Sequence, residues 1–166
     1  MNRFSSAAGL ALAALAVMGL AGPAAAGEQV PFKGRLKGAF TVTSVSPPIV
    51  NEIVTGTGNA THLGKFTWVL ALRVDVSTTP ALLTGTFQFK AANGDTVYGT
   101  FSGTASPTPN PDVVSFVEAM TITGGTGRFA GAAGGFTLQG LVNLVTTETT
   151  GSFTGTISSP GAAKRP

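Results

Sequence analysis

The chain has 166 residues, among them ten Lys and Arg, seven Asp and Glu, one His and no Cys. Without Cys there is no disulfide, so the hydrophobic core alone must stabilise the fold. A transition-metal site needs several nitrogen or sulfur ligands, and the scattered acids lack the spacing of a calcium loop. We therefore expect no metal and no cofactor. The basic excess is too small to indicate a nucleic-acid-binding protein.

The first 26 residues have the pattern of a secretory signal peptide. Arg3 gives a positive start, residues 7–20 form an apolar run, and a Gly-Pro pair ends this run before three alanines. Small residues at that place predict cleavage after Ala26. The run is short for a membrane span of about 20 residues, and no Cys is present for lipid attachment. We therefore expect a secreted or periplasmic protein, free of the membrane after cleavage; the Ala-rich leader on a Cys-free chain is typical of bacteria.

The remaining chain is long enough for one domain, which we expect over residues 27–160, with 161–166 as a flexible tail. Removal of the leader leaves nine basic and seven acidic residues. Lys33, Arg35 and Lys37 fall on one side of an alternating segment. We interpret them as an ordinary solvated strand face.

After residue 27 the chain is rich in Gly, Thr, Val and Phe and shows no helical periodicity. Alternation of apolar and polar residues with period two predicts half-buried strands. It is clearest in 32–42, 66–76, 83–90, 96–103, 113–123, 136–144 and 153–157. We count about eight strands in a meander.

Turn signals separate these segments, and Gly alternates with Phe on their apolar sides. Pro47-Pro48, the Asn93-Gly94-Asp95 turn and the Pro-rich 107–111 segment are examples. Regular short strands predict a sandwich or a closed barrel. A coiled strand needs Gly where it bends, and Phe fills the adjacent space. The pattern therefore favours an all-β, eight-stranded antiparallel barrel of calycin-like type.

The stretch TITGGTGRFAGAAGGF, residues 121–136, contains Gly125-x-Gly127-x-x-Ala130, close to the dinucleotide-binding fingerprint. That fingerprint requires a helix that opens at the glycines inside a strand–helix–strand unit. Residues 130–135 are too short and too rich in Gly for such a helix. We interpret the stretch as a tight connection between two strands, with Phe129 as a plug at the barrel end.

The segment TGGTGRFAGAAG, residues 123–134, resembles the corresponding turn of the allene oxide cyclase and dirigent-like barrels. The segments NATHLGKFTW and AANGDTVYGTFSGT resemble small secreted bacterial members of that superfamily. The resemblance covers residues 30–159 and implies an eight-stranded antiparallel barrel with an apolar cavity. Plant relatives form dimers or trimers, so it also implies a homo-oligomer. The catalytic acids of those enzymes have no residue-by-residue match in this sequence.

Glu118 is the acid with the most informative position. In the 113–123 segment it shares one face with Val114 and Phe116. If this face lines the barrel interior, burial would raise the carboxyl pKa, as for a general acid or a ligand contact. The alternatives are an outward face in solvent or at a subunit contact, and a buried Glu satisfied by Arg or by backbone.

The other polar candidates point to structural roles. His62 precedes a strand, where a hydrogen bond to nearby backbone is its expected role, with a place at a cavity mouth as the alternative. Glu52 and Asp75 have the pattern of surface acids, and Arg73 lies two residues from Asp75 on the same face. An exposed ion pair of this kind contributes little stability.

Three functions fit these observations. The first is a barrel that binds a small hydrophobic or aromatic molecule; the second is a cofactor-independent cyclase or isomerase with Glu118 as its acid or base; the third is a structural barrel with a filled core. For the first, the expected ligand-binding residues are Phe40, Trp68, Phe87, Phe101, Phe116, Glu118 and Phe153. We expect no nucleic-acid partner.

Export should yield a mature chain that begins at Gly27, because the three alanines before it suit signal peptidase. Intact mass and N-terminal sequencing of exported protein measure this. Full-length protein in the membrane fraction would contradict the prediction.

Overall fold

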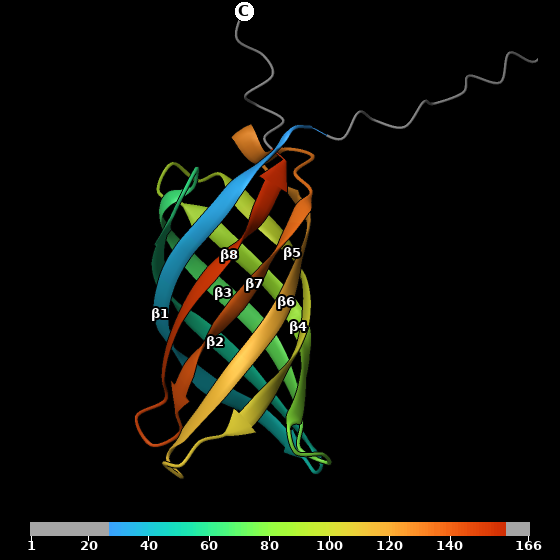
Figure 1. The fold of residues 1–166 in the computed structure, drawn as a ribbon, viewed down its shortest axis with the longest axis vertical. Helices are drawn as coiled ribbons and strands as arrows, with labels where there is room; N and C mark the ends of the chain where they lie inside the picture. The colour runs from blue at the N-terminus through green and yellow to red at the C-terminus, as the bar shows by residue number, and fades with distance from the viewer. Residues whose placement is uncertain (1–26, 159–166) are drawn as a thin grey trace, which may run out of the picture.

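The computed structural model describes residues 27–158 and shows one closed antiparallel β-barrel (Figure 1). The predicted signal peptide and the predicted tail lie outside the described residues. Each strand pairs with its neighbours in chain order, and β8 closes the barrel against β1. The strands are β1 (Gln29–Ser46), β2 (Ile49–Ala60), β3 (Gly64–Asp75), β4 (Ala81–Ala91), β5 (Thr96–Pro107), β6 (Val113–Gly125), β7 (Gly134–Asn143) and β8 (Glu148–Ser158). The predicted all-β, eight-stranded barrel is therefore confirmed.

One strand, β2, is absent from the seven segments that alternation located. Its inward positions include Val50, Glu52 and Val54, while Ile49 and Ile53 alternate with them and lie on the opposite face. Apolar residues on both faces and an acid on the inner one hide the period of two. The predicted strand count is nevertheless right, because the meander needs β2 between β1 and β3.

Glycine lies directly across from an aromatic residue on neighbouring strands at many inward positions. The pairs are Gly34 with Phe153, Gly58 with Phe66, Gly56 with Trp68, Gly85 with Phe101, Gly99 with Phe87, Gly140 with Phe116 and Gly155 with Phe136. A Cβ on Gly38, which pairs with Gly56, would lie 2.7 Å from Trp68 Cζ2. The rings thus occupy the volume that the missing side chains leave free, as the sequence pattern predicted.

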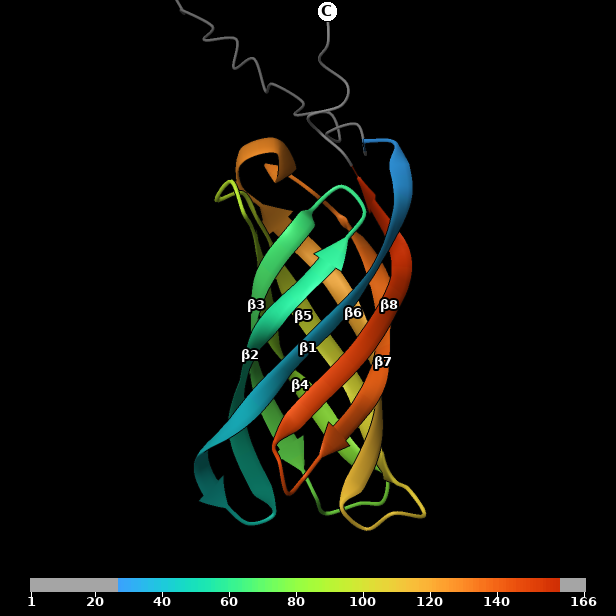
Figure 2. The same cartoon turned by 90° about the vertical axis from the view of Figure 1, so that its left-hand side faces the viewer.

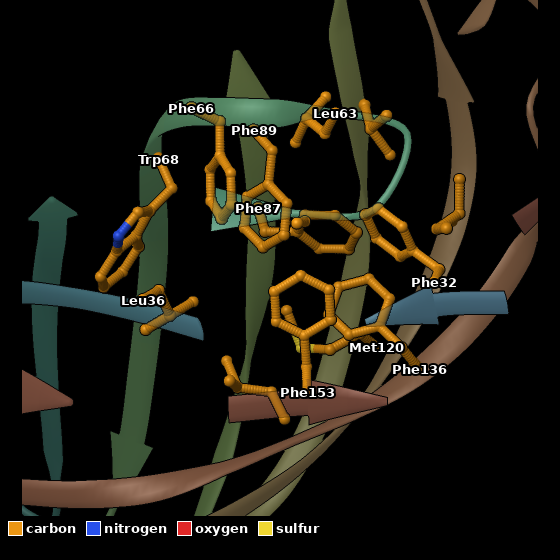
Figure 3. Packing of buried hydrophobic residues seen from close by; sticks show 14 of the residues in the cluster. Phe32, Leu36, Leu63, Phe66, Trp68, Phe87, Phe89, Met120, Phe136 and Phe153 are labelled. Carbon is orange, nitrogen blue, oxygen red and sulfur yellow. The ribbon is translucent and has the colours of Figure 1, made fainter. Parts of the chain in front are cut away.

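Packed rings fill one end of the barrel, which carries the short helix η1 (Gly127–Phe129) and which we call the η1 end (Figures 1 and 3). Phe66 stacks on Phe89 with ring centroids 4.8 Å apart, and Phe136 lies 4.8 Å from Phe153. Figure 2 shows the β2–β3 hairpin at the same end. Leu63 at its tip is buried in the same core.

The glycine-rich stretch forms a turn and holds only η1 of three residues, so the dinucleotide-binding alternative is excluded. Gly127 has φ +58°, a conformation that residues with a Cβ rarely adopt. The Nε atom of Arg128 lies 3.2 Å from Asp95 Oδ2 in the neighbouring β4–β5 turn. Phe129 is only 3 % exposed, which confirms that it plugs this end of the barrel.

Replacement of Gly127 by Val should lower the free energy of unfolding by about 1–3 kcal/mol, because the positive φ is strained for Val. A Cβ at this position would also overlap the Asp95 carboxylate. Gly131→Ala is the control, since Gly131 has φ +73° but open space around it. Urea unfolding should show the larger loss for Gly127→Val; equal or absent losses would contradict this role for the turn.

Candidate ligand-binding site

A cavity of about 380 Å³ occupies the end of the barrel opposite η1, which we call the cavity end. The loops β1–β2, β3–β4, β5–β6 and β7–β8 lie at this end (Figure 1). Most of the lining is aliphatic and comes from every part of the barrel wall. The inward aliphatic residues are Leu36, Val50, Val54, Leu70, Leu72, Val74, Leu83, Ala105, Val114, Leu138 and Val142. The interior is therefore filled at one end and hollow at the other.

Trp68 lies where the two halves meet. It lines the cavity and also belongs to the buried core (Figure 3). Its indole Nε1 donates to the carbonyl oxygens of Lys37 and Thr57, each at 3.3 Å. Because backbone satisfies the polar atom of the ring, Trp68 presents an apolar surface to the cavity.

The predicted inward face of β6 is confirmed. Phe116, Glu118, Met120 and Ile122 are buried, and Phe116 and Glu118 line the cavity. Glu118 is 3 % exposed. It lies opposite Gly103 on β5, where a Cβ would come within 3.0 Å of Glu118 Cγ. The absent side chain of Gly103 thus leaves room for the carboxylate arm.

The carboxyl group of Glu118 has an unsatisfied oxygen. Within residues 27–158, no hydrogen-bond donor lies within reach of Glu118 Oε2. Burial raises the pKa of this carboxyl from 4.5 to about 7, because the charged form loses its hydration. Of the alternatives from the sequence, the outward face is therefore wrong, and Glu118 Oε2 has no satisfying Arg or backbone group in the part of the chain described.

Two further polar residues reach the same cavity. The Thr149 side chain of β8 is buried, and its Oγ1 also has no hydrogen-bond partner among the described residues. Glu52 of β2 is half-buried in the lining, where burial raises its carboxyl pKa. The prediction of Glu52 as a surface acid is wrong, because β2 directs it inward between Val50 and Val54. Sequence reasoning missed Thr149, which lies just after the β7–β8 turn.

The structure divides the expected ligand-binding residues into two groups. Phe40, Trp68, Phe116 and Glu118 line the cavity. Phe87 and Phe153 lie in the packed rings of the η1 end instead. Their ring centroids are 5.2 Å and 5.8 Å, respectively, from the ring centroid of Phe89. Phe101 is buried in the core but does not line the cavity. All seven side chains point inward, and depth along the barrel separates them.

The remaining polar candidates lie away from the hollow interior. His62 is exposed at the η1 end, where its Nε2 lies 3.1 Å from the carbonyl oxygen of Pro31. This contact agrees with the structural role expected for it. Arg73 Nη2 lies 3.7 Å from Asp75 Oδ2, and the two residues form the expected ion pair on the outside of the barrel.

The cavity has an apolar entrance. Val76 in the β3–β4 loop and Leu144 in the β7–β8 loop line it and are about half exposed, at 55 % and 49 %. Thr78 and Thr79 complete the lining from the same β3–β4 loop. A molecule that enters between these loops meets apolar surface before it reaches Glu118.

The chain matches no family model and no curated protein. In the described residues, no cluster of three or more acidic or His side chains could hold a metal ion. No helix within residues 27–158 is long and apolar enough to cross a membrane.

Glu118 should make the protein less stable as the pH rises. Its folded-state pKa of about 7 lies above the ordinary 4.5, so the unfolded chain releases the proton first and stability falls across this window. The loss from this group is on the order of 3 kcal/mol. Glu118→Gln should remove it, so the variant should gain on the parent between about pH 5 and about pH 8 in chemical unfolding.

Glu148→Gln is the control, since Glu148 is exposed at the same end of the barrel. It should retain the pH dependence of the parent. Parallel curves for the parent and Glu118→Gln would show that the carboxyl is solvated and would contradict its burial.

Proposed function

We propose that this protein is an exported barrel that binds a small amphipathic molecule in its cavity. The apolar body of the ligand packs against the aliphatic wall, and its polar groups reach Glu118 and Thr149. The observation that carries the proposal is the pair of buried polar atoms, Glu118 Oε2 and Thr149 Oγ1, which lack partners in an otherwise apolar cavity.

A buried polar group without a partner costs about 1–3 kcal/mol. An aliphatic side chain at either position would avoid that cost. Both groups lie on the hollow part of the interior, where a ligand can supply the missing hydrogen bonds. The two positions are therefore best explained as ligand contacts.

The dimensions and chemistry of the cavity restrict the ligand. Its volume of about 380 Å³ lies near the lower end of ligand pockets, which are roughly 300–1,000 Å³. Below about pH 7 the neutral Glu118 carboxyl donates a hydrogen bond. The Thr149 hydroxyl both donates and accepts. A compact apolar molecule with carbonyl or hydroxyl groups fits this arrangement.

A second candidate function is a cofactor-independent cyclase or isomerase, in line with the resemblance to allene oxide cyclase and dirigent-like barrels. The pKa of Glu118, about 7 in a largely apolar cavity, favours it because a general acid or base works best near the ambient pH. The cavity walls would hold a reactive conformer in position. Loss of turnover in Glu118→Gln with ligand binding retained would distinguish this enzyme from a binding protein.

An apolar fluorescent probe such as an anilinonaphthalene should bind the protein at about 1:1 and change the emission of Trp68, the single Trp of the chain. Ala105→Phe should abolish this binding, because Ala105 lines the cavity. Ala71→Phe is the matched control, since Ala71 is exposed on the outer face of β3. Equal binding by both variants, or none by the parent at micromolar protein, would contradict the proposal.

Thr149→Val should stabilise the empty protein by about 1–3 kcal/mol, because it removes an unsatisfied hydroxyl at nearly constant volume. The same change should weaken binding of a probe that carries a carbonyl group. Thr150→Val, one residue along on the exposed face, should leave binding unchanged. A destabilised Thr149→Val protein would indicate a hydrogen bond within the protein and remove this anchor.

A further inference from the structure

Four cationic side chains line a shallow groove on the outside of the barrel wall. They are Arg35 and Lys37 of β1, Lys65 of β3 and Lys90 of β4. All four are exposed, and within residues 27–158 none of them forms an ion pair with a carboxylate. The lining includes no acid. Like charges gathered on one sheet face repel one another, so an anion in the groove would relieve that repulsion.

Strand pairing fixes the layout of this basic groove. β1, β2 and β3 lie side by side in Figure 2. Two rows cross the groove: Arg35–Asn59–Lys65, and Lys37–Thr57–Thr67–Lys90. With strands ~4.8 Å apart, the backbones of the outer cations are separated by ~10 Å in the first row and ~14 Å in the second, and the rows by ~7 Å. Long cationic side chains thus flank a floor of short polar ones.

We propose that this groove binds an acidic polysaccharide. The cations on either side pair with carboxylate or sulfate groups spaced along the chain. The hydroxyls of Thr57 and Thr67 and the amide of Asn59 exchange hydrogen bonds with sugar hydroxyls. A polymer is favoured over a single anion because the charges are spread over three strands instead of converging on one point.

The composition of the groove disfavours the two other common polyanions. Single-stranded nucleic acid is held by stacking on exposed aromatic rings, and the only aromatic residue in the lining, Phe66, is buried. Attachment to an anionic membrane uses apolar side chains that enter the interface. The exposed large apolar residues of the described chain, such as Val45 and Val145, do not line the groove.

The purified full chain tests this with polygalacturonate and dextran sulfate as carboxylate and sulfate probes, and neutral dextran as the blank. Calorimetry near physiological salt should show saturable binding to at least one acidic polymer and none to dextran. Lys37→Gln and Lys65→Gln should each weaken binding about two- to fivefold, the scale of one exposed ion pair. Arg73→Gln makes the same charge change outside the groove and should have no effect.

Asn59→Ala keeps the charge and separates sugar recognition from charge attraction. It should weaken polysaccharide binding also at raised salt, where long-range attraction is screened. Three results would overturn the proposal: no binding to either acidic polymer, an equal loss in Arg73→Gln, or tighter binding to a single-stranded oligonucleotide or to anionic vesicles than to both polysaccharides.

Discussion

The uneven filling of a fixed interior is the constraint on which the rest of this structure depends. Eight closed strands set the width of the barrel, so side-chain volume alone decides where it is solid. At the η1 end the rings of Phe32, Phe66, Phe89, Phe136 and Phe153 pack against one another. At the cavity end the lining is mainly aliphatic, with two glutamates and the rings of Phe40, Trp68 and Phe116, and it encloses about 380 Å³. The ring-filled end stabilises the closed barrel, and the other end can therefore remain hollow.

This division lets the chain carry polar groups that would otherwise destabilise the core. Glu118 and Thr149 lie unsatisfied beside aliphatic walls, and such groups are unfavourable unless something pairs with them. At the η1 end the buried Ser158 hydroxyl accepts a hydrogen bond from the Ala133 N–H, and no buried side-chain polar atom described there is unsatisfied. The packed core and the proposed binding site thus lie on different parts of the same strands. Strand β6 shows this within one element. Its part nearer the η1 end contributes Met120 and Ile122 to the core, and its part nearer the cavity end contributes Phe116 and Glu118 to the cavity.

Much of the fold could be predicted from local pattern, because alternation and Gly–Phe spacing are properties of single strands. The inward face of β6, the glycine turn at Gly127 and the Phe129 plug were all recognised that way. The position of a residue along the barrel axis was not, because it depends on the register between strands. For that reason the sequence predicted both Phe40 and Phe87 as ligand-binding residues. Phe40 lines the cavity, whereas Phe87 lies in the packed rings. Glu52 was misplaced for a related reason: the alternation of β2 is obscured by apolar residues on both of its faces.

The cavity and the basic groove are two sides of the same sheet. On β1 the inward Leu36 lines the cavity, while its neighbours Arg35 and Lys37 point outward into the groove. Trp68 joins the two surfaces physically, because its indole donates to the carbonyl oxygens of Lys37 and Thr57, both groove residues. One layer of backbone therefore separates the proposed polymer site on the outside from the proposed ligand site within. Because the two proposed sites lie on opposite faces of the wall, an acidic polymer bound in the groove would leave the cavity end open to a ligand.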